Sequence, residues 1–273
     1  MDNSGSFTYC SIRFTGQQLG PGNELQGLTL GGVGNGTVIS HVESINSADD
    51  GIEIFGGTVN ISNFIVLNPD DDGFDADQGW TGTADNLVYI GAATNAGFGS
   101  DHAFELDGPE GDTGGTAVVG TFTNATAWGR SATDFADLRD GATYTLTNSY
   151  FFGFSAGVDF ELDADGSTDS NGNAVSDNSA ISDNYVSGDV TLTGLEFSGI
   201  DRDGATTFTD ITKILNDKLD GSLTTPDKTS QVDNNEDVKF PGDNSIVTTK
   251  TVGANVSVLS WSYTAELGLL ANF

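Results

Sequence analysis

The chain has 273 residues, of which 36% are hydrophobic, and its 40 acidic residues against nine Lys and Arg give a formal net charge of −31. A field of this sign repels nucleic-acid phosphates and anionic lipid surfaces, so neither is an expected partner. The single Cys excludes a disulfide framework and a thiolate zinc site, and no apolar run is long enough for a transmembrane segment.

The first segments, 7–14 and 25–30, alternate apolar with polar residues as half-buried strands do. The N-terminus has no signal-peptide pattern and begins like the middle of a strand array. We therefore expect a leader segment to precede it.

The most informative feature is a repeat of the form Asp-Asp-Gly-apolar-acid. It occurs at 49–53 and again, 22 residues later, at 71–75, with weaker echoes at 101–105 and 157–160. A repeat of this length, with alternating apolar residues and no helical period, is typical of a stacked solenoid. We therefore predict an all-β fold, a right-handed parallel β-helix of roughly seven or eight rungs over residues 1–205.

A second set of repeated segments carries an Asn at one equivalent position. The members are Asn63, Asn86, Asn124, Asn148 and Asn184, and His41 occupies the same position in the first copy. Asn tolerates left-handed backbone, and its amide can bond to the next copy. We predict a structural ladder at this position.

From about Thr206 the repeat pattern breaks. Apolar residues over 208–219 have helical spacing, a polar loop follows over 224–245, and 256–263 alternates like a final strand. Residues 206–273 are therefore predicted to be a C-terminal cap that contains one short helix and Trp261 and covers the open end of the solenoid.

Several ordered motifs resemble those of secreted and surface-attached β-helix proteins of marine and environmental bacteria. The matching stretches are 23–30, 32–37, 49–58 and 74–82. The resemblance implies a parallel β-helix that is exported to the cell surface or beyond it. For function it implies little, because the group is largely uncharacterised and often lipoprotein-like.

Stacking the repeats also stacks the acids. Glu53, Asp75, Glu105 and Asp159 are expected in one outward row, with neighbours about 4.8 Å apart. Arg139 is expected to face outward beside them, with Leu138 inward. Repulsion at that distance must be offset by raised pKa values, by solvent or by a bound cation.

Oxygen-rich segments suggest where a cation would bind. One is the loop that carries Asp70, Asp71, Asp72, Asp75 and Asp77. Calcium takes six to eight hard oxygen ligands in irregular geometry and is therefore the expected cofactor. A second candidate contains Asp163, Asp165 and Asp169, for which the alternative is a plain polar insertion.

The same acids could instead catalyse polysaccharide cleavage. Burial could split the pKa values of clustered carboxylates into a general acid and a base. The candidates are Asp49, Asp50, Asp71, Asp72 and Asp75, with His102 one rung above Asp72. Against a lyase, the Lys and Arg that would hold a uronate carboxylate are scarce.

Trp80 lies in a turn-like Gly-Trp-Thr-Gly context beside the acids. It is either an exposed platform for a sugar ring or a side chain folded back onto the solenoid. With Glu53, Glu105 and Arg139 it completes the candidate ligand-binding set. The leading hypothesis is an extracellular or cell-surface module that binds glycans or a partner surface without catalysis, supported by calcium. A polysaccharide-cleaving enzyme and a structural subunit of a surface filament remain the alternatives.

Overall fold

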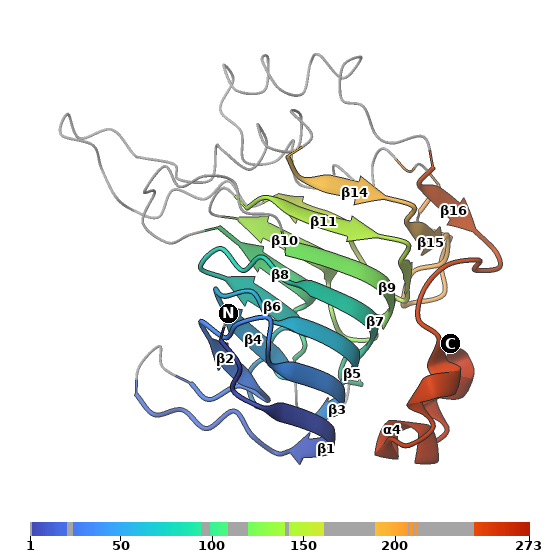
Figure 1. Cartoon of the computed structure of the whole chain (residues 1–273). Helices are drawn as coiled ribbons and strands as arrows, with labels where there is room; N and C mark the ends of the chain where they lie inside the picture. Colours follow the sequence, from blue (N-terminus) through green and yellow to red (C-terminus); the bar gives the residue numbers. More distant parts are fainter. Residues whose placement is uncertain are drawn as a thin grey trace.

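The structure is a computed structural model that describes residues 2–20, 24–93, 99–108, 120–139, 142–160, 189–206, 208–209, 211 and 243–273. The described strands form two sheets, and within both sheets all pairing is parallel. Successive turns of the chain stack one above another in a solenoid, which confirms the predicted parallel β-helix (Figure 1). Eight levels follow one another in the larger sheet, in agreement with the predicted number of rungs.

The larger sheet has ten strands in the described part of the chain. They are β1 (Ser6–Arg13), β3 (Val38–Ile45), β5 (Asn60–Leu67), β7 (Thr83–Ile90), β9 (Gly120–Trp128), β11 (Tyr144–Thr147), β12 (Tyr150–Phe152), β14 (Thr191–Thr193), β15 (Glu196–Ser198) and β16 (Ser245–Val247). The smaller sheet has six. They are β2 (Thr29–Gly31), β4 (Ile52–Phe55), β6 (Phe74–Asp77), β8 (His102–Asp107), β10 (Asp134–Arg139) and β13 (Val158–Phe160).

The long strands of the larger sheet bend at one equivalent residue. That residue has a positive φ in every copy, and the set is Tyr9, His41, Asn63, Asn86, Asn124 and Asn148. The Asn86 amide donates to Asn63 Oδ1 at 2.7 Å, and the Asn124 amide donates to Asp85 Oδ1 at 2.7 Å. This confirms the predicted Asn ladder and the place of His41 in it, whereas Asn184 lies outside the described residues.

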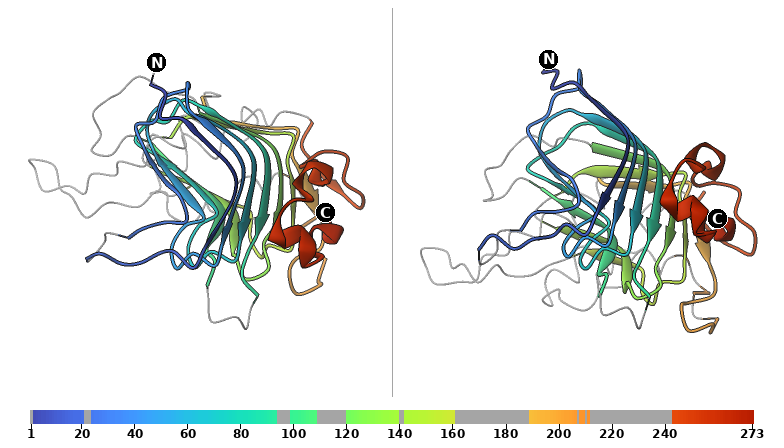
Figure 2. Two further views of the ribbon diagram at one scale, coloured as in Figure 1. Left: turned by 60° about the horizontal axis from the view of Figure 1, so that its bottom comes forward. Right: turned by 90° about the horizontal axis from the view of Figure 1, so that it is seen from below.

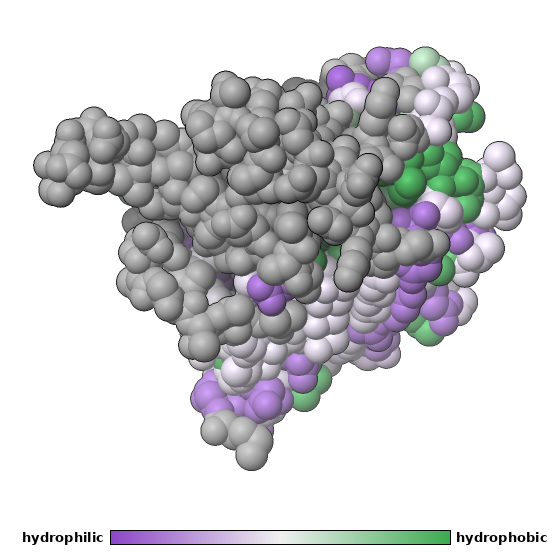
Figure 3. Space-filling model, turned by 90° about the horizontal axis from the view of Figure 1, so that it is seen from above, coloured by the Kyte–Doolittle hydropathy of each residue, from purple (hydrophilic) through white to green (hydrophobic). Residues whose placement is uncertain are grey.

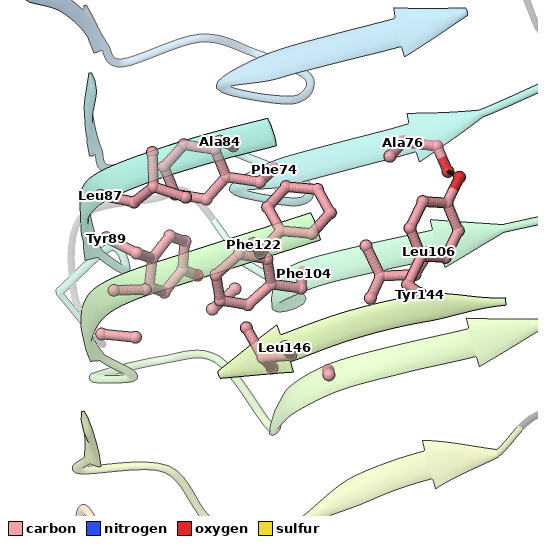
Figure 4. Close-up of a cluster of buried hydrophobic side chains, with 14 of the residues drawn as sticks. Phe74, Ala76, Ala84, Leu87, Tyr89, Phe104, Leu106, Phe122, Tyr144 and Leu146 are labelled. Carbon is pink, nitrogen blue, oxygen red and sulfur yellow. Dashed lines mark hydrogen bonds between the residues drawn. The ribbon is translucent and has the colours of Figure 1, made fainter. Parts of the chain in front are cut away.

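Inward-facing residues of the two sheets meet in one apolar core. The ring of Phe74 stacks on that of Phe104 with centroids 5.4 Å apart, because their strands are paired in register. Phe122 and Tyr144 complete this layer, and the Tyr144 hydroxyl donates to the carbonyl of Ala76 at 3.1 Å (Figure 4). Such stacking fixes the register of the strands and hence the positions of the side chains that point the other way.

The last part of the chain is not a strand, and the prediction of one over 256–263 is wrong. After β16, residues 248–273, called the tail here, form η2 (Val256–Leu259), α4 (Tyr263–Glu266) and η3 (Leu269–Asn272). The Asn255 side chain accepts from the N–H of Ser257, and the Ser262 side chain accepts from the N–H of Ala265. These caps favour helical turns over an extended chain.

The tail runs along the side of the larger sheet, not across an open end of the solenoid (Figures 1 and 2). Thr251 and Val252 donate backbone N–H groups to Glu196 on β15, and Asn255 donates to Asn86 on β7 at 2.6 Å. Tyr263 donates to Glu43 on β3 at 3.0 Å. The tail therefore crosses successive rungs from one end of the stack towards the other.

The helix predicted over 208–219 and the polar loop lie largely outside the described residues. Among the residues that are described, no helix is long and apolar enough to span a membrane.

Candidate functional site: an acidic face on the smaller sheet

The outward side of the smaller sheet carries a row of acids, one from each of four neighbouring strands. Glu53 pairs with Asp75, Asp75 with Glu105, and Glu105 with Asp137. The backbone of Asp159 continues this row beyond Asp137. The predicted row is confirmed for Glu53, Asp75 and Glu105, whereas the side chain of Asp159 lies outside the described part of the structure. Asp137, and not Arg139, lies between Glu105 and Asp159 in the strand register.

A second row lies where the same strands begin. Asp50 Oδ1 accepts the backbone N–H of Asp72 at 3.0 Å. Asp72 Oδ1 in turn accepts the backbone N–H of His102 at 2.7 Å and lies 2.9 Å from its ring Nδ1. His102 pairs with Asp134 on the next strand. The predicted position of His102 one rung above Asp72 is therefore confirmed.

A third set lies further along the strands. Asp77 ends β6 and Asp107 ends β8, and Arg139 pairs with Asp107 on β10. The Arg139 guanidinium binds Asp107 at 2.8 Å and also forms an ion pair with Glu105. Leu138 is fully buried, as predicted, and Arg139 faces outward. Arg139 is thus held by two carboxylates of this sheet.

The three sets together form the acidic face. Its members are Asp50, Glu53, Asp72, Asp75, Asp77, Glu105, Asp107, Asp134 and Asp137, with His102 and Arg139. Although these acids point away from the core, each is at most 9% exposed. The row was predicted from the sequence to face outward, but its burial was not, and burial determines its chemistry.

Burial without enough hydrogen-bond donors raises the pKa of several of these carboxyls. Burial and the charges of Asp72 and Asp49 raise the pKa of Asp50 well above its usual range. Burial also raises the pKa of Asp75, with Asp50 adding to the effect. For Glu53, burial raises the pKa to about 7, although a hydrogen bond with Asp75 opposes the rise.

His102 has the opposite preference for charge. Burial opposes its protonation, but the hydrogen bond to Asp72 and the charge of Asp72 outweigh that cost and raise the pKa of His102 to about 9. His102 is therefore a cation at neutral pH. With Arg139 it is one of two cationic side chains on the acidic face.

Three groups of carboxylates are close enough to share a cation. In each, ligand atoms lie within 4.8 Å of one another, and Asp50 belongs to all three. The inner groups are Asp50 with Glu53 and Asp75, and Asp50 with Asp72 and Glu105. The outer group is Asp49, Asp50 and Asp71.

The predicted calcium loop is therefore divided. Asp71, Asp72 and Asp75 contribute to different groups, whereas Asp70 and Asp77 belong to none of them. Asp70 is exposed, and its Oδ1 accepts the backbone N–H of Gly99 at 2.7 Å. The second predicted site, at Asp163, Asp165 and Asp169, lies outside the described residues.

Asp75 has one oxygen that the protein leaves unsatisfied. Its side chain is 6% exposed, and Oδ1 is buried with no hydrogen-bond partner. A buried carboxylate oxygen without a donor is costly unless it is protonated or bound to a cation. Asp75 is also a member of the inner group with Asp50 and Glu53.

Trp80 is not an exposed sugar platform, so that candidate role is wrong and the alternative of a folded-back side chain is correct. Its side chain is fully buried, and its indole N–H donates to the carbonyl of Val59 at 3.0 Å. The ring packs 5.2 Å from that of Phe122. Gly82 permits this, because a Cβ there would meet the indole at 2.6 Å.

Comparison with known proteins shows the family to which the chain belongs. The family model described as a pectate-lyase like beta helix domain matches residues 1–244. The match spans the strands from β1 to β15, including the acidic face, and ends before β16 and the tail. No curated protein and no solved structure matches the chain.

Proposed function

The chain belongs to the pectate-lyase-like β-helix family, and on that premise we propose that it is an exported, cell-surface polysaccharide-binding protein whose acidic face holds calcium. The main support for a bound cation comes from Asp75, whose Oδ1 is buried without a hydrogen-bond partner and which offers a ligand atom within 4.8 Å of ligand atoms of Asp50 and Glu53. A divalent cation in this group would supply the positive charge that the fold does not supply there.

The ligand chemistry favours calcium over other metals. Every residue of the three groups is a carboxylate, and imidazole and thiolate ligands are absent from them. Carboxylate oxygens suit hard cations, and calcium accepts more ligands and less regular geometry than magnesium.

The outer group is where a glycan could meet the cation. Asp50 is buried, Asp49 is half-buried and Asp71 is exposed. A calcium ion held there would keep coordination positions open to solvent. Hydroxyl or carboxylate oxygens of a polysaccharide could fill those positions, so the inner group would support the fold and the outer group would bind the ligand.

Burial favours binding over catalysis at the inner groups. A general acid or base must reach the atom whose proton it moves, and the inner carboxylates are at most 9% exposed. Arg139 is held by Glu105 and Asp107, so it is already neutralised by protein acids.

One observation favours the enzyme as second candidate. In the outer group, partial burial and the charges of Asp72 and Asp49 raise the pKa of Asp71 to about 7. A carboxyl with this pKa is suited to donate a proton near neutral pH, and Asp71 is exposed. Hydrolysis would release reducing ends from a polysaccharide, and lyase cleavage would release unsaturated ends.

The cation is tested by calcium titration with thermal unfolding. Saturating calcium at 100 times Kd should add about 2.7 kcal/mol to the stability, and EDTA should remove it. Asp75→Asn should abolish this gain while leaving the EDTA-treated protein at least as stable as the parent, because Asn removes a carboxyl whose ionisation is opposed by burial and by neighbouring acids. Glu266→Gln, which removes an exposed charge from α4, is the matched control and should keep the gain. If EDTA leaves the melting curve unchanged, the proposal that a bound calcium ion stabilises the fold is refuted.

Glycan binding is tested on a polysaccharide array with calcium and with EDTA. Asp71→Asn should lose binding and keep the calcium-dependent rise in Tm, because Asp71 belongs to the outer group alone. Release of new reducing or unsaturated ends that stops in Asp71→Asn would instead establish the enzyme. An array with no calcium-dependent binding would rule out the proposed module.

A further inference from the structure

A cleft that contains no residue of the acidic face lies at the corner where β9, β12 and β15 end. It has a volume of about 550 Å³. Its lining combines two aromatic side chains, one aliphatic and two arginines, together with the acids of one turn: Trp128, Phe152, Ile200, Arg130, Arg202, Asp201 and Asp203. The volume is in the range of pockets that bind small molecules. In the view from above, apolar residues gather at one side of the described surface (Figure 3).

The two arginines differ from the other arginines of the chain because neither has an acidic partner among the described residues. All four arginines are described, and Arg13 pairs with Glu43 while Arg139 pairs with acids of the acidic face. Within the described residues, Arg130 and Arg202 form no ion pair, although the chain has 40 acids. Both line the same cleft.

Their hydrogen bonds hold the guanidinium groups in place and leave donors free. Arg202 donates through Nη1 to the carbonyl of Ser131 at 2.8 Å, and Arg130 donates through Nη1 to Asn68 Oδ1 at 3.3 Å. The Arg130 guanidinium also lies 5.1 Å from the centroid of the Trp128 ring. An arginine has five N–H groups, so each retains donors for an anionic ligand.

The apolar side of the cleft is rigid. The rings of Trp128 and Phe152 stack with centroids 5.7 Å apart and an interplanar angle of 13°, because the two residues are paired in adjacent strands. Gly153 continues the wall, since a Cβ there would meet the Trp128 ring at 2.8 Å. Exposed Ile200 adds aliphatic surface. Such a surface suits the C–H face of a sugar ring better than a fully charged ligand.

We propose that this cleft binds one anionic sugar unit, a ring with hydroxyl groups and a single carboxylate or sulfate. Arg130 and Arg202 would hold the anionic group, the apolar face of the ring would lie against Trp128 and Phe152, and Asp203 would accept ring hydroxyls. The site is independent of calcium, because none of the cation groups of the acidic face contributes to it. A polysaccharide with both kinds of contact would bind at two places on the solenoid.

The test is calorimetric titration in EDTA with three monosaccharides, namely glucuronate, glucose 6-sulfate and neutral glucose. At least one anionic sugar should bind, and glucose should bind at least tenfold more weakly. Arg202→Gln should weaken binding about tenfold. Arg13→Gln changes the net charge equally but affects an arginine that is paired with Glu43, so it should leave binding unchanged.

Unchanged thermal unfolding of Arg202→Gln would show that the loss comes from the site and not from the fold. Equal binding of glucose, equal weakening by Arg13→Gln, or no binding of either anionic sugar would each overturn the proposal. The use of EDTA separates this site from the acidic face, because a failed calcium site would leave the result here unaltered.

Discussion

Buried carboxylates occur on both flanks of this solenoid, and the fold treats them in opposite ways. Under the tail, Glu43 is 1% exposed and accepts the backbone N–H groups of Tyr263 and Thr264 as well as the Thr264 hydroxyl. On the acidic face, Asp75 is also buried, yet one of its oxygens has no donor.

The pKa values follow the same division. Burial alone would raise the pKa of Glu196, but hydrogen bonds from Thr251 and Val252 outweigh it and lower that pKa. The pKa of Asp75 is raised, because burial is reinforced by neighbouring acids. The comparison teaches that a carboxylate supplied with protein donors has a structural task, whereas one left without them indicates a missing proton or cation.

The largest effect that would sharpen this comparison is a change of stability with pH in EDTA. The pKa values of Glu53 and Asp71 rise from their ordinary values near 4 to about 7, and that of Asp50 rises as well. A carboxyl whose pKa is higher in the folded than in the unfolded protein stabilises the fold fully at pH values below its unfolded pKa. This stabilisation is lost as the pH rises through the pKa of the folded protein. His102, with its pKa raised to about 9, acts in the same direction.

We therefore expect Tm in EDTA to fall by several degrees between pH 5 and pH 8. Calcium should reduce the fall, because a cation stabilises the charged carboxylates. Differential scanning calorimetry across this range, with and without calcium, measures both. A Tm that rises with pH in EDTA would contradict the interpretation of the acidic face.

The next effect concerns the tail. Glu43→Ala leaves two N–H groups and one hydroxyl of α4 without their acceptor, so we expect a loss of about 3 kcal/mol in the free energy of unfolding. Urea denaturation measures the loss, and limited proteolysis should then cut within residues 248–273. Glu266→Ala in the same helix is the control, because Glu266 is exposed and should change stability by less than about 0.5 kcal/mol. Equal effects of the two substitutions would show that Glu43 does not anchor the tail.

The smallest expected effect comes from two substitutions in the Asn ladder, which together separate the cost of backbone strain from the cost of lost hydrogen bonds. Asn86 has a φ of 59° and accepts the N–H of Asn255. Asn86→Ala should cost about 2 kcal/mol, from the left-handed backbone and the lost hydrogen bonds to Asn63 and Asn255 together. Asn86→Gly keeps the backbone conformation accessible and should cost about half as much. If Ala and Gly cost the same in urea denaturation, strain contributes nothing at this position.

Much of the fold could be predicted from the sequence, because each rung repeats the same local pattern. The alternation around Ile52 and Phe74 places both inward, and the acids that follow them fall into register. Asp137 and Asp107 were not predicted as members of the acidic face. The alternation of acids with apolar residues in β8 and β10 is nevertheless the same pattern that predicted the other acids.

The remaining errors have physical causes. The segment 256–263 alternates like a strand, but the capping side chains of Asn255 and Ser262 favour helical turns. Trp80 stands in a glycine-rich turn typical of exposed loops, yet Gly82 makes room for its ring to fold inward. The missing partner of Asp75 depends on contacts across several rungs, which no local pattern reports.

The path of the tail has a consequence for how the molecule unfolds. A solenoid whose repeats touch only their neighbours can fray from an end, one repeat at a time. Here the bond between Glu43 and Thr264 joins residues 221 positions apart, and that between Asn86 and Asn255 spans 169. Closing such large loops is slow and comes late in folding, but once closed they oblige distant repeats to open together. We therefore expect the repeats joined by the tail to unfold together, whereas a solenoid without such a tail would lose its repeats one by one from an end.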